Sequence, residues 1–298
     1  MTRVALVGLG EVGRVFAEDL RALGVTDLSA WDTAFADDAS RASRNAAALG
    51  LAPAGSAAEA VAGADLVVSA VTAMNCVPAA SSAAAGIDAG AWFFDLNSSS
   101  PGHKREAADA IHGAGGRYVE AALMSPIEPR RLASPFLLGG PHAAGFGRAA
   151  AGFGMSEARV GAPEIGVAAA TKLCRSVVVK GLESLLSESL LAARAYGVED
   201  QVLASLSNIL PEADWEAIAG YFVSRSLQHG GRRAEEMEEA AATVADAGVE
   251  PWMARATVER QRWAARYGDV LPQPSTPALI DAVREAAGLA GTRTGEGS

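Results

Sequence analysis

Cysteine is almost absent from this chain. Cys76 and Cys174 are the two cysteines among 298 residues, and they stand far apart in the sequence. Two distant cysteines cannot form the disulfide framework of a small secreted domain, and they lack the paired spacing of a zinc site. We therefore expect a cytoplasmic protein without a bound metal.

Concentrated positive charge and long hydrophobic segments are lacking as well. The formal net charge is -10, and no run of Lys and Arg exceeds two residues, so the chain offers no electrostatic footprint for nucleic acid. The uncharged stretch between Asp65 and Asp88 is long enough to span a membrane, but Pro78, Gly86 and several hydroxyl groups interrupt it. The expected partner is a small molecule rather than nucleic acid or a membrane.

The first half of the chain alternates strand-like and helix-like patterns. Short apolar runs at residues 3–7, 28–31, 66–71 and 92–96 predict strands, with Ala-rich stretches of helical spacing between them. Strands that alternate with helices imply a doubly wound parallel sheet. We therefore expect an α/β Rossmann-type domain that binds a dinucleotide over residues 1–162.

From about residue 163 the strand patterns disappear and helical periodicity replaces them. Gly and Pro turns, among them Gly230 and Gly231, separate the apolar stretches. Helices are predicted at residues 168–196, 201–210, 215–227, 233–247 and 252–267. We expect residues 163–290 to form an all-helical domain for substrate binding and dimerisation, which begins with a long interdomain helix at about 166–196. Residues 291–298 are predicted to be a flexible tail.

A glycine-rich turn joins the first predicted strand to the helix that follows. It reads Gly8-Leu9-Gly10-Glu11-Val12-Gly13. In this pattern the first glycine permits a tight turn, the second lets the backbone approach a pyrophosphate, and the third lets the helix pack closely on the strand. The helix directs its N-terminal N–H groups toward the phosphates. Because the turn lies between a strand and a helix, we expect these six residues to bind a dinucleotide.

Asp32 bears on the choice between the two nicotinamide dinucleotides, since it closes the second strand about 20 residues further on. Its carboxylate can accept hydrogen bonds from the adenosine ribose and would repel a 2′-phosphate. NAD is therefore the preferred cofactor, although Arg41 and Arg44 lie close enough in the sequence to leave NADP possible. The alternative is that Asp32 only begins a turn with Thr33.

Three further motifs extend the argument beyond the cofactor. They are Asp95-Leu-Asn97-Ser98-Ser99-Ser100-Pro101, Val119-Glu-Ala-Ala-Leu-Met-Ser125-Pro126 and Lys172-Leu-Cys-Arg-Ser176. In this order, over the whole chain, they resemble the β-hydroxyacid dehydrogenase family, which includes 3-hydroxyisobutyrate and 6-phosphogluconate dehydrogenases. The tract from His229 to Glu239 resembles a branch of that family with its own helical C-terminal domain.

The resemblance implies roles for residues beside the nicotinamide and the substrate. The family's strand-end element Asp-x-Ser-Thr-x-x-Pro puts Asn97 and Ser98 at its Ser and Thr positions. This implies a cofactor contact for Asn97 and a substrate contact for Ser98. We also expect cofactor contacts from Val71 and Thr72. Ser125 represents the family's substrate loop, without the glycines that follow it there.

Lys172 is implied by the resemblance to be the catalytic acid and base, with Ser176 in place of the family's asparagine. On a helix, Lys172, Ser176, Lys180, Glu183 and Ser187 fall on one polar stripe. Such a stripe is either solvated or faces a catalytic cleft. A free lysine, with a pKa of about 10.4, is a poor base at neutral pH, so burial and the oxidised nicotinamide would have to lower that pKa.

Ser176, Lys180, His229 and Arg232 are expected to contribute to the substrate site, although a solvated helix explains His229 and Arg232 equally well. The leading prediction is an NAD(P)-dependent dehydrogenase that interconverts an alcohol and a carbonyl on a small β-hydroxy acid or a related anion. The alternatives are an imine reductase, whose usual pattern lacks the lysine, and a non-catalytic dinucleotide sensor. The resemblance also implies a homodimer.

Overall fold

The computed structural model describes residues 2–208 and 212–289. It contains two compact units, the N-terminal unit Met1–Leu173 and the helical unit Cys174–Ser298. The tail predicted at 291–298, and residues 209–210 of the helix predicted at 201–210, lie outside the described residues. The domain boundary between residues 162 and 163 stays a prediction.

Seven strands build one sheet in the N-terminal unit. They are β1 (Arg3–Val7), β2 (Asp27–Trp31), β3 (Leu66–Ser69), β4 (Trp92–Asp95), β5 (Arg117–Leu123), β6 (Phe136–Gly139) and β7 (Ala158–Ala162). Their order is β2-β1-β3-β4-β5-β6-β7, and all neighbours pair parallel except β5 and β6. The predicted Rossmann-type fold is confirmed, but the sheet is not wholly parallel.

The antiparallel pair follows from the content of the connection between β5 and β6. Residues 124–135 contain only the short 3₁₀ helix Arg131–Ala133. A parallel return to the same sheet usually passes through an α-helix, which this connection lacks. The chain therefore turns back directly beside β5.

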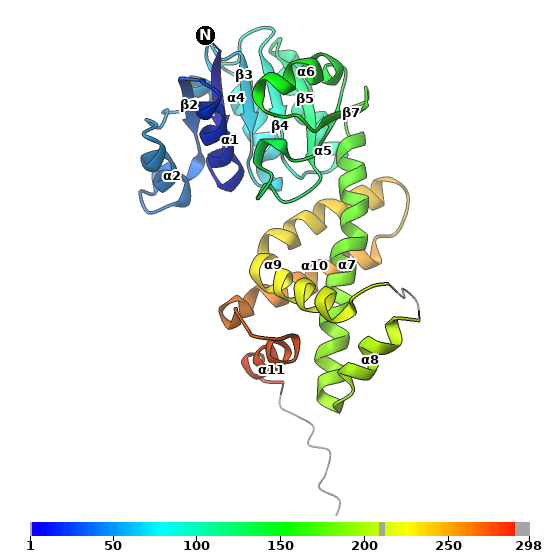
Figure 1. Cartoon of the computed structure of the whole chain (residues 1–298). Helices are drawn as coiled ribbons and strands as arrows, with labels where there is room; N and C mark the ends of the chain where they lie inside the picture. The colour runs from blue at the N-terminus through cyan, green and yellow to red at the C-terminus, as the bar shows by residue number, and fades with distance from the viewer. Residues whose placement is uncertain (1, 209–211, 290–298) are drawn as a thin grey trace, which may run out of the picture. The chain divides into compact units, whose positions relative to one another are not determined.

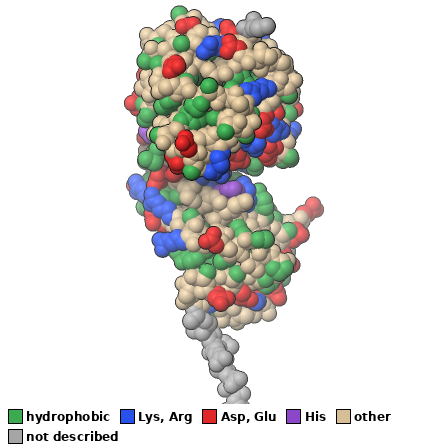
Figure 2. Space-filling model, turned by 90° about the vertical axis from the view of Figure 1, so that its left-hand side faces the viewer, with side chains coloured by type: hydrophobic (Ala, Val, Ile, Leu, Met, Phe, Trp, Pro, Cys, Tyr) green, Lys and Arg blue, Asp and Glu red, His purple; other side chains and the backbone are tan. Residues whose placement is uncertain are grey.

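Helices cover both faces of this sheet (Figure 1). Alternate residues of a strand point to opposite faces, so in β1 the side chains of Val4 and Leu6 join one core and those of Ala5 and Val7 join the other. The first core is covered by α1 (Glu11–Ala22), α2 (Arg41–Leu49) and α6 (Ala143–Ala150), and the second by α3 (Ala57–Val61), α4 (Cys76–Ala84) and α5 (Pro101–Gly113). On the face that Figure 2 shows, acidic and basic side chains lie interspersed over this unit.

The strand order reverses at β1, since β2 lies on one side of it and β3 on the other. Beyond β2 the sheet continues as a single parallel bridge between Ala30 and Pro53. In doubly wound sheets, ligands bind outside the carboxyl ends of the strands at such a reversal. Gly8 and Asp32 directly follow the ends of β1 and β2, so both predicted cofactor motifs lie at this edge.

The helical unit holds no strand among its described residues, which confirms the predicted all-helical C-terminal region. Its helices are the later part of α7 (Val167–Tyr196), α8 (Glu199–Leu206), α9 (Trp215–Asp246), α10 (Trp252–Ala264) and α11 (Thr276–Ala286). Its apolar core joins side chains of α7, α9, α10 and α11, among them Leu190, Leu227, Ala264 and Ile280. None of the described helices is long and apolar enough to cross a membrane.

The prediction of two helices at residues 215–227 and 233–247 is wrong, because the single helix α9 runs through Gly230 and Gly231. Glycine costs about 1 kcal/mol in a helix interior. At Gly230, however, a Cβ would lie 2.4 Å from the carbonyl oxygen of Gln261 in α10. The glycine therefore lets the two helix backbones approach each other, and this packing overrides the local turn signal.

Candidate functional site

Two of the three turn glycines are required by the protein's own packing. Gly8 has a φ of +97°, and its N–H donates to the Trp31 carbonyl at 2.8 Å. A Cβ at Gly8 would lie 2.4 Å from the Ala70 carbonyl oxygen, and one at Gly13 would lie 2.1 Å from the Gly8 carbonyl oxygen. The strand and the helix therefore meet more closely here than a larger residue allows.

Gly10 has no such reason within the protein, because a Cβ there would meet nothing within 4 Å. It is the N-cap of α1 and provides no side-chain cap to the first N–H groups of that helix. Leu9 is buried, while Glu11 is exposed at the start of the helix. Open space above an uncapped helix N-terminus, beside a tight turn, fits the pyrophosphate of a dinucleotide.

Asp32 braces the same turn from the end of β2. Its Oδ2 accepts from the Leu9 N–H at 2.8 Å, and its Oδ1 accepts from the Ala34 N–H at 2.9 Å, which caps the 3₁₀ helix Thr33–Ala36. The turn-starting alternative is therefore present in the structure. A carboxylate offers about four lone-pair sites, so two bonds to N–H groups leave acceptor capacity for a ribose.

Asn45 in α2 holds the glycine turn, and no sequence motif marked it. Its Nδ2 donates to the Leu9 carbonyl at 2.8 Å and to the Gly10 carbonyl at 3.2 Å. These bonds hold the carbonyl groups of Leu9 and Gly10 in place. No spacing rule connects an asparagine so far along the chain with the glycine motif, because only the fold brings them together.

Asn97, beyond the end of β4, joins two strand ends. Its Oδ1 accepts from the Val71 N–H at 2.7 Å, and its Nδ2 donates to the Ser69 Oγ at 3.0 Å. The side chain is buried. Thr72, which follows Val71 in the chain, is exposed. Asn97 thus orders the loop after β3, and its own contact with a cofactor, like those of Val71 and Thr72, stays a prediction.

A buried polar cluster surrounds the carboxylate of Asp95, the last residue of β4. Its Oδ1 accepts from Lys104 Nζ at 2.8 Å and from the Asn97 N–H at 2.9 Å. Its Oδ2 accepts from Tyr118 Oη at 2.6 Å and from Cys76 Sγ at 3.3 Å. All five residues are buried, and no sequence motif marked Lys104 or Tyr118.

The charges in this cluster belong to Asp95 and Lys104. Burial opposes the charge of Lys104, but the nearby carboxylates of Asp95 and Glu120 favour it, and the pKa of the ammonium is raised above its usual value. Burial raises the pKa of the Cys76 thiol to about 12 and raises the pKa of Tyr118 well above its usual range. The thiol and the phenol therefore remain protonated donors to the carboxylate at neutral pH.

Lys172 meets Ser98 within the N-terminal unit. Its Nζ donates to Ser98 Oγ at 2.6 Å. The start of α7 is held by Glu120 of β5, whose carboxylate accepts from the Gly166 N–H at 2.6 Å and from the Ala169 N–H at 2.5 Å. Burial raises the pKa of Glu120. This carboxylate anchors the helix turn that carries Lys172, so two predicted site residues from distant segments are brought together.

Ser125 follows β5 as Ser98 follows β4. The two strands are parallel neighbours, so both serines lie beyond the same edge of the sheet. Ser125 is half-buried and donates from its Oγ to the Pro126 carbonyl at 3.0 Å. A substrate contact would have to replace this local bond, and Ser125 stays a predicted substrate residue.

The remaining candidates lie in the helical unit, where Glu236 of α9 pairs with two of them. Lys180 Nζ donates to Ser176 Oγ at 3.1 Å and pairs with Glu236 at 2.8 Å, and Arg232 pairs with the same carboxylate. Burial lowers the pKa of Lys180, against the effect of Glu236. His229 is half-buried. Substrate contacts by Ser176, Lys180, His229 and Arg232 stay predictions.

The polar stripe of α7 continues into a second buried cluster. Glu183 pairs with Arg233 of α9 and accepts from Gln261 Nε2 of α10 at 3.2 Å. Gln261 also donates to Ser226 Oγ at 3.2 Å. Ser176, Glu183 and Ser187 are all buried. For these stripe residues the solvated alternative is wrong, because the stripe packs on α9 and α10.

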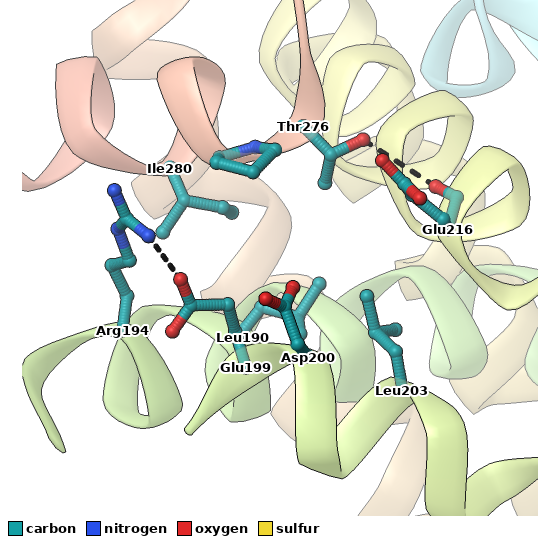
Figure 3. Close-up of a pocket in the computed structure, with 9 residues that line it drawn as sticks. Leu190, Arg194, Glu199, Asp200, Leu203, Glu216, Thr276 and Ile280 are labelled. Carbon is teal, nitrogen blue, oxygen red and sulfur yellow. Dashed lines mark hydrogen bonds and ion pairs between the residues drawn. The ribbon is translucent and has the colours of Figure 1, made fainter. Parts of the chain in front are cut away.

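The helical unit also contains a small hollow (Figure 3). Figure 3 shows Arg194 directed at Glu199 on one side and Thr276 directed at Glu216 on the other. The volume of this hollow, about 20 Å³, admits about one water molecule. It is too small for a dinucleotide or a hydroxy acid. In the described ranges, no group of three or more His, Cys, Asp or Glu is arranged to hold a metal ion.

Two family models match the chain. Residues 3–145 match the NAD binding domain of 6-phosphogluconate dehydrogenase, and residues 193–264 match a domain of unknown function, DUF1932. Among curated proteins, none matches this chain.

Solved structures match over nearly the whole chain. A conserved hypothetical protein from Sinorhizobium meliloti is 33% identical, with a TM-score of 0.73 and 96% of each chain covered. The 3-hydroxyisobutyrate dehydrogenase of Mycobacterium tuberculosis, solved with L-serine, is 20% identical, with a TM-score of 0.71 and coverage of 95% of this chain and 99% of that one. A reductive aminase from Aspergillus terreus is 20% identical, with a TM-score of 0.55 and coverage of 94% and 99%.

Proposed function

Because this chain belongs to the β-hydroxyacid dehydrogenase family, in a branch whose helical region matches DUF1932, we propose that it interconverts an alcohol and a carbonyl on a small β-hydroxy acid or a related anion. The observation that carries the proposal is the 2.6 Å hydrogen bond between Lys172 Nζ and Ser98 Oγ. It joins an amine and a hydroxyl beyond the carboxyl end of β4, at the edge of the sheet that also bears the glycine turn.

The dinucleotide would be held by the turn Gly8–Gly13, with the uncapped N–H groups of α1 facing its phosphates. When bound, an oxidised dinucleotide would supply the hydride acceptor for oxidation of the alcohol. Asp32 supports NAD over NADP, because its remaining acceptor sites suit ribose hydroxyls while its charge repels a 2′-phosphate.

Lys172 supplies the proton chemistry in this proposal. In oxidation its neutral amine takes the proton of the substrate hydroxyl as the carbon gives up hydride, and in reduction its ammonium returns that proton to the carbonyl oxygen. Ser98, already bonded to Lys172, can orient the same oxygen. We propose that Ser125, beyond the neighbouring strand, provides a second serine hydroxyl that contacts the substrate.

The substitution Lys172→Ala tests this role. We expect kcat to fall about 10²–10⁴-fold, as for the loss of a general base, while the Kd for NADH stays nearly unchanged. Assays would use NAD or NADP with 3-hydroxyisobutyrate, L-serine and related acids, and NADH binding would be followed by fluorescence. Arg175→Ala is the matched control, because Arg175 is an exposed charge on the same helix. A Lys172→Ala enzyme with normal turnover would contradict the assignment.

Reduction of an imine is the second candidate, since a reductive aminase shares the fold. The lysine favours alcohol chemistry, which an assay of NADPH oxidation with cyclic imines would test. Faster turnover of an imine than of every hydroxy acid would reverse the order of the two candidates.

A homodimer in the cytoplasm completes the proposal. Light scattering measures the mass of the protein in solution, and a monomeric mass would contradict the homodimer. The exposed thiol of Cys174 suits a reducing compartment.

A further inference from the structure

Asp95, Lys104 and Tyr118 form a buried group to which the proposed chemistry gives no role. Their exposed fractions are 0%, 1% and 0%. A buried ion pair contributes little net stability compared with apolar residues of the same size. Stability alone therefore does not explain why Asp95 and Lys104 form an ion pair beside the candidate site.

The contacts of Asp95 lead directly to Ser98, the serine proposed to contact the substrate. Oδ1 accepts from the Asn97 N–H at 2.9 Å, and the next residue, Ser98, accepts from Lys172 Nζ at 2.6 Å. The side chain of Asn97 in turn holds the Val71 N–H at 2.7 Å. The orientation of one carboxylate thus bears on the loops after both β3 and β4.

We propose that Lys104 and Tyr118 are positioning residues that act through Asp95 to hold Ser98 against Lys172. The inference rests on the proposed function, because it assigns these residues to the precision of that site. Neither residue is required to touch the substrate.

The two residues divide this task between the two carboxylate oxygens. Tyr118 holds Oδ2 at 2.6 Å, which prevents rotation of a group whose terminal torsion is otherwise broad. Lys104 pairs with Oδ1 at 2.8 Å and donates to the Asp95 carbonyl oxygen at 3.3 Å. Oδ1 is thereby kept in place, as a charged acceptor, for the Asn97 N–H.

Cys76 provides a matched control within the same cluster. Its Sγ also lies against Oδ2, at 3.3 Å, but a thiol is a weak donor. Removal of the Tyr118 hydroxyl should therefore disturb the carboxylate, whereas removal of the Cys76 thiol should not.

The first test compares Tyr118→Phe with Cys76→Ala. We expect Tyr118→Phe to lower kcat about 10-fold through misplacement of Ser98, with the KM for dinucleotide and the Kd for NADH within twofold of wild type. Cys76→Ala should keep the wild-type kcat. Equal kcat values for Tyr118→Phe and wild type would overturn the role of Tyr118, as would a loss of activity matched by an equal loss of NADH binding.

A charge-neutral double variant guards against loss of folding. Lys104→Met leaves Asp95 buried without its cation and should lower kcat at least as much as Tyr118→Phe. Asp95→Asn combined with Lys104→Met removes both charges and keeps a carbonyl oxygen for the Asn97 N–H, although an NH2 group replaces the oxygen that accepts from Tyr118, so its kcat should rise only part of the way from that of Lys104→Met to that of wild type. No recovery in a folded double variant would overturn the role of Lys104 as the partner of this acceptor.

A crystal structure of Tyr118→Phe separates this inference from the proposed function. The distance between Ser98 Oγ and Lys172 Nζ, 2.6 Å in the native protein, should lengthen beyond hydrogen-bonding range. This result does not depend on turnover, so it decides the positioning role even if no hydroxy acid is a substrate. An unchanged distance would overturn the inference, whereas normal activity of Lys172→Ala would overturn only the proposed function.

Discussion

Both units of this protein bury ion pairs, but at different places in their folds. In the N-terminal unit Asp95 and Lys104 meet at the end of a strand, and the carboxylate also holds the backbone of the loop that follows. In the helical unit Glu183 and Arg233 meet in the middle of two helices, and Gln261 adds a third helix. The first pair lies next to the loop that bears the proposed site residue Ser98, while the second joins continuous helices.

The glycines show the same contrast. Gly8 and Gly13 lie at a strand-to-helix turn, where the backbone itself must pass close to its neighbours. Gly230 lies inside a helix and makes room for α10. The same residue type therefore shapes a strand-to-helix turn in one unit and a helix contact in the other, which is why the local pattern alone misleads.

The largest expected effect is a loss of stability when the ion pair of the helical unit is broken. Arg233→Met leaves Glu183 buried without a cation, so we expect the free energy of unfolding of the helical unit to fall by about 3–5 kcal/mol. Combining it with Glu183→Gln should restore most of that loss. Urea unfolding followed by circular dichroism measures both, with Arg255→Met, at an exposed pair, as the control. A stable Arg233→Met variant would remove the proposed structural role.

A second prediction concerns the helix contact. Gly230→Ala places a methyl group 2.4 Å from the Gln261 carbonyl oxygen, and we expect a loss of about 1–3 kcal/mol in unfolding free energy through overpacking. Gly231→Ala is the matched control, since a Cβ there meets nothing within 4 Å. It should stabilise the helix by up to about 1 kcal/mol. If both variants lose equal stability, the close approach of α9 and α10 does not explain the glycine.

In the turn, the expected effect is on binding rather than on folding. Gly10→Ala fits the protein without a clash, but its methyl group would stand where the pyrophosphate approaches. We expect NADH affinity to weaken about tenfold, or about 1.4 kcal/mol, with little change in melting temperature. Gly13→Ala should instead lower the melting temperature. Unchanged NADH binding by Gly10→Ala would contradict the cofactor site.

The smallest expected effect is a difference in the titration of two lysines. The pKa of Lys104 is raised, so its contribution to stability is complete below the ordinary lysine pKa and is lost as the pH rises through the folded value. The pKa of Lys180 is lowered by burial, so its contribution is present above the ordinary pKa and is lost as the pH falls through the folded value. NMR titration of the lysine side chains should show Lys180 losing its proton first, and the reverse order would contradict both environments.

Local patterns predicted much of the N-terminal unit. The apolar run that stops at Gly8 marks β1, because burial on both faces of a strand demands continuous hydrophobicity. The glycine motif marks the turn for similar reasons. Local patterns could not predict the antiparallel β6 or the continuity of α9, since each depends on which segment becomes the neighbour.

The candidate site was predictable only in part. Lys172 and Ser98 were found through resemblance, and the fold joins them. Asn45 and Lys104 carry no local signal, because an asparagine or lysine in a helix is ordinarily solvent-exposed. Their partners at Gly10 and Asp95 become visible only when distant segments are packed together.

Chemical rescue of Lys172→Ala tests the central claim most directly. If the lysine amine moves the substrate proton, added primary amines should restore turnover, and the restored rate should rise with amine concentration and with amine basicity. Parallel assays with Arg175→Ala control for general effects of the amines. We predict a rescue of at least tenfold over the unassisted variant. A Lys172→Ala enzyme that loses activity but shows no response to any small amine would contradict the assignment of Lys172 as the acid and base.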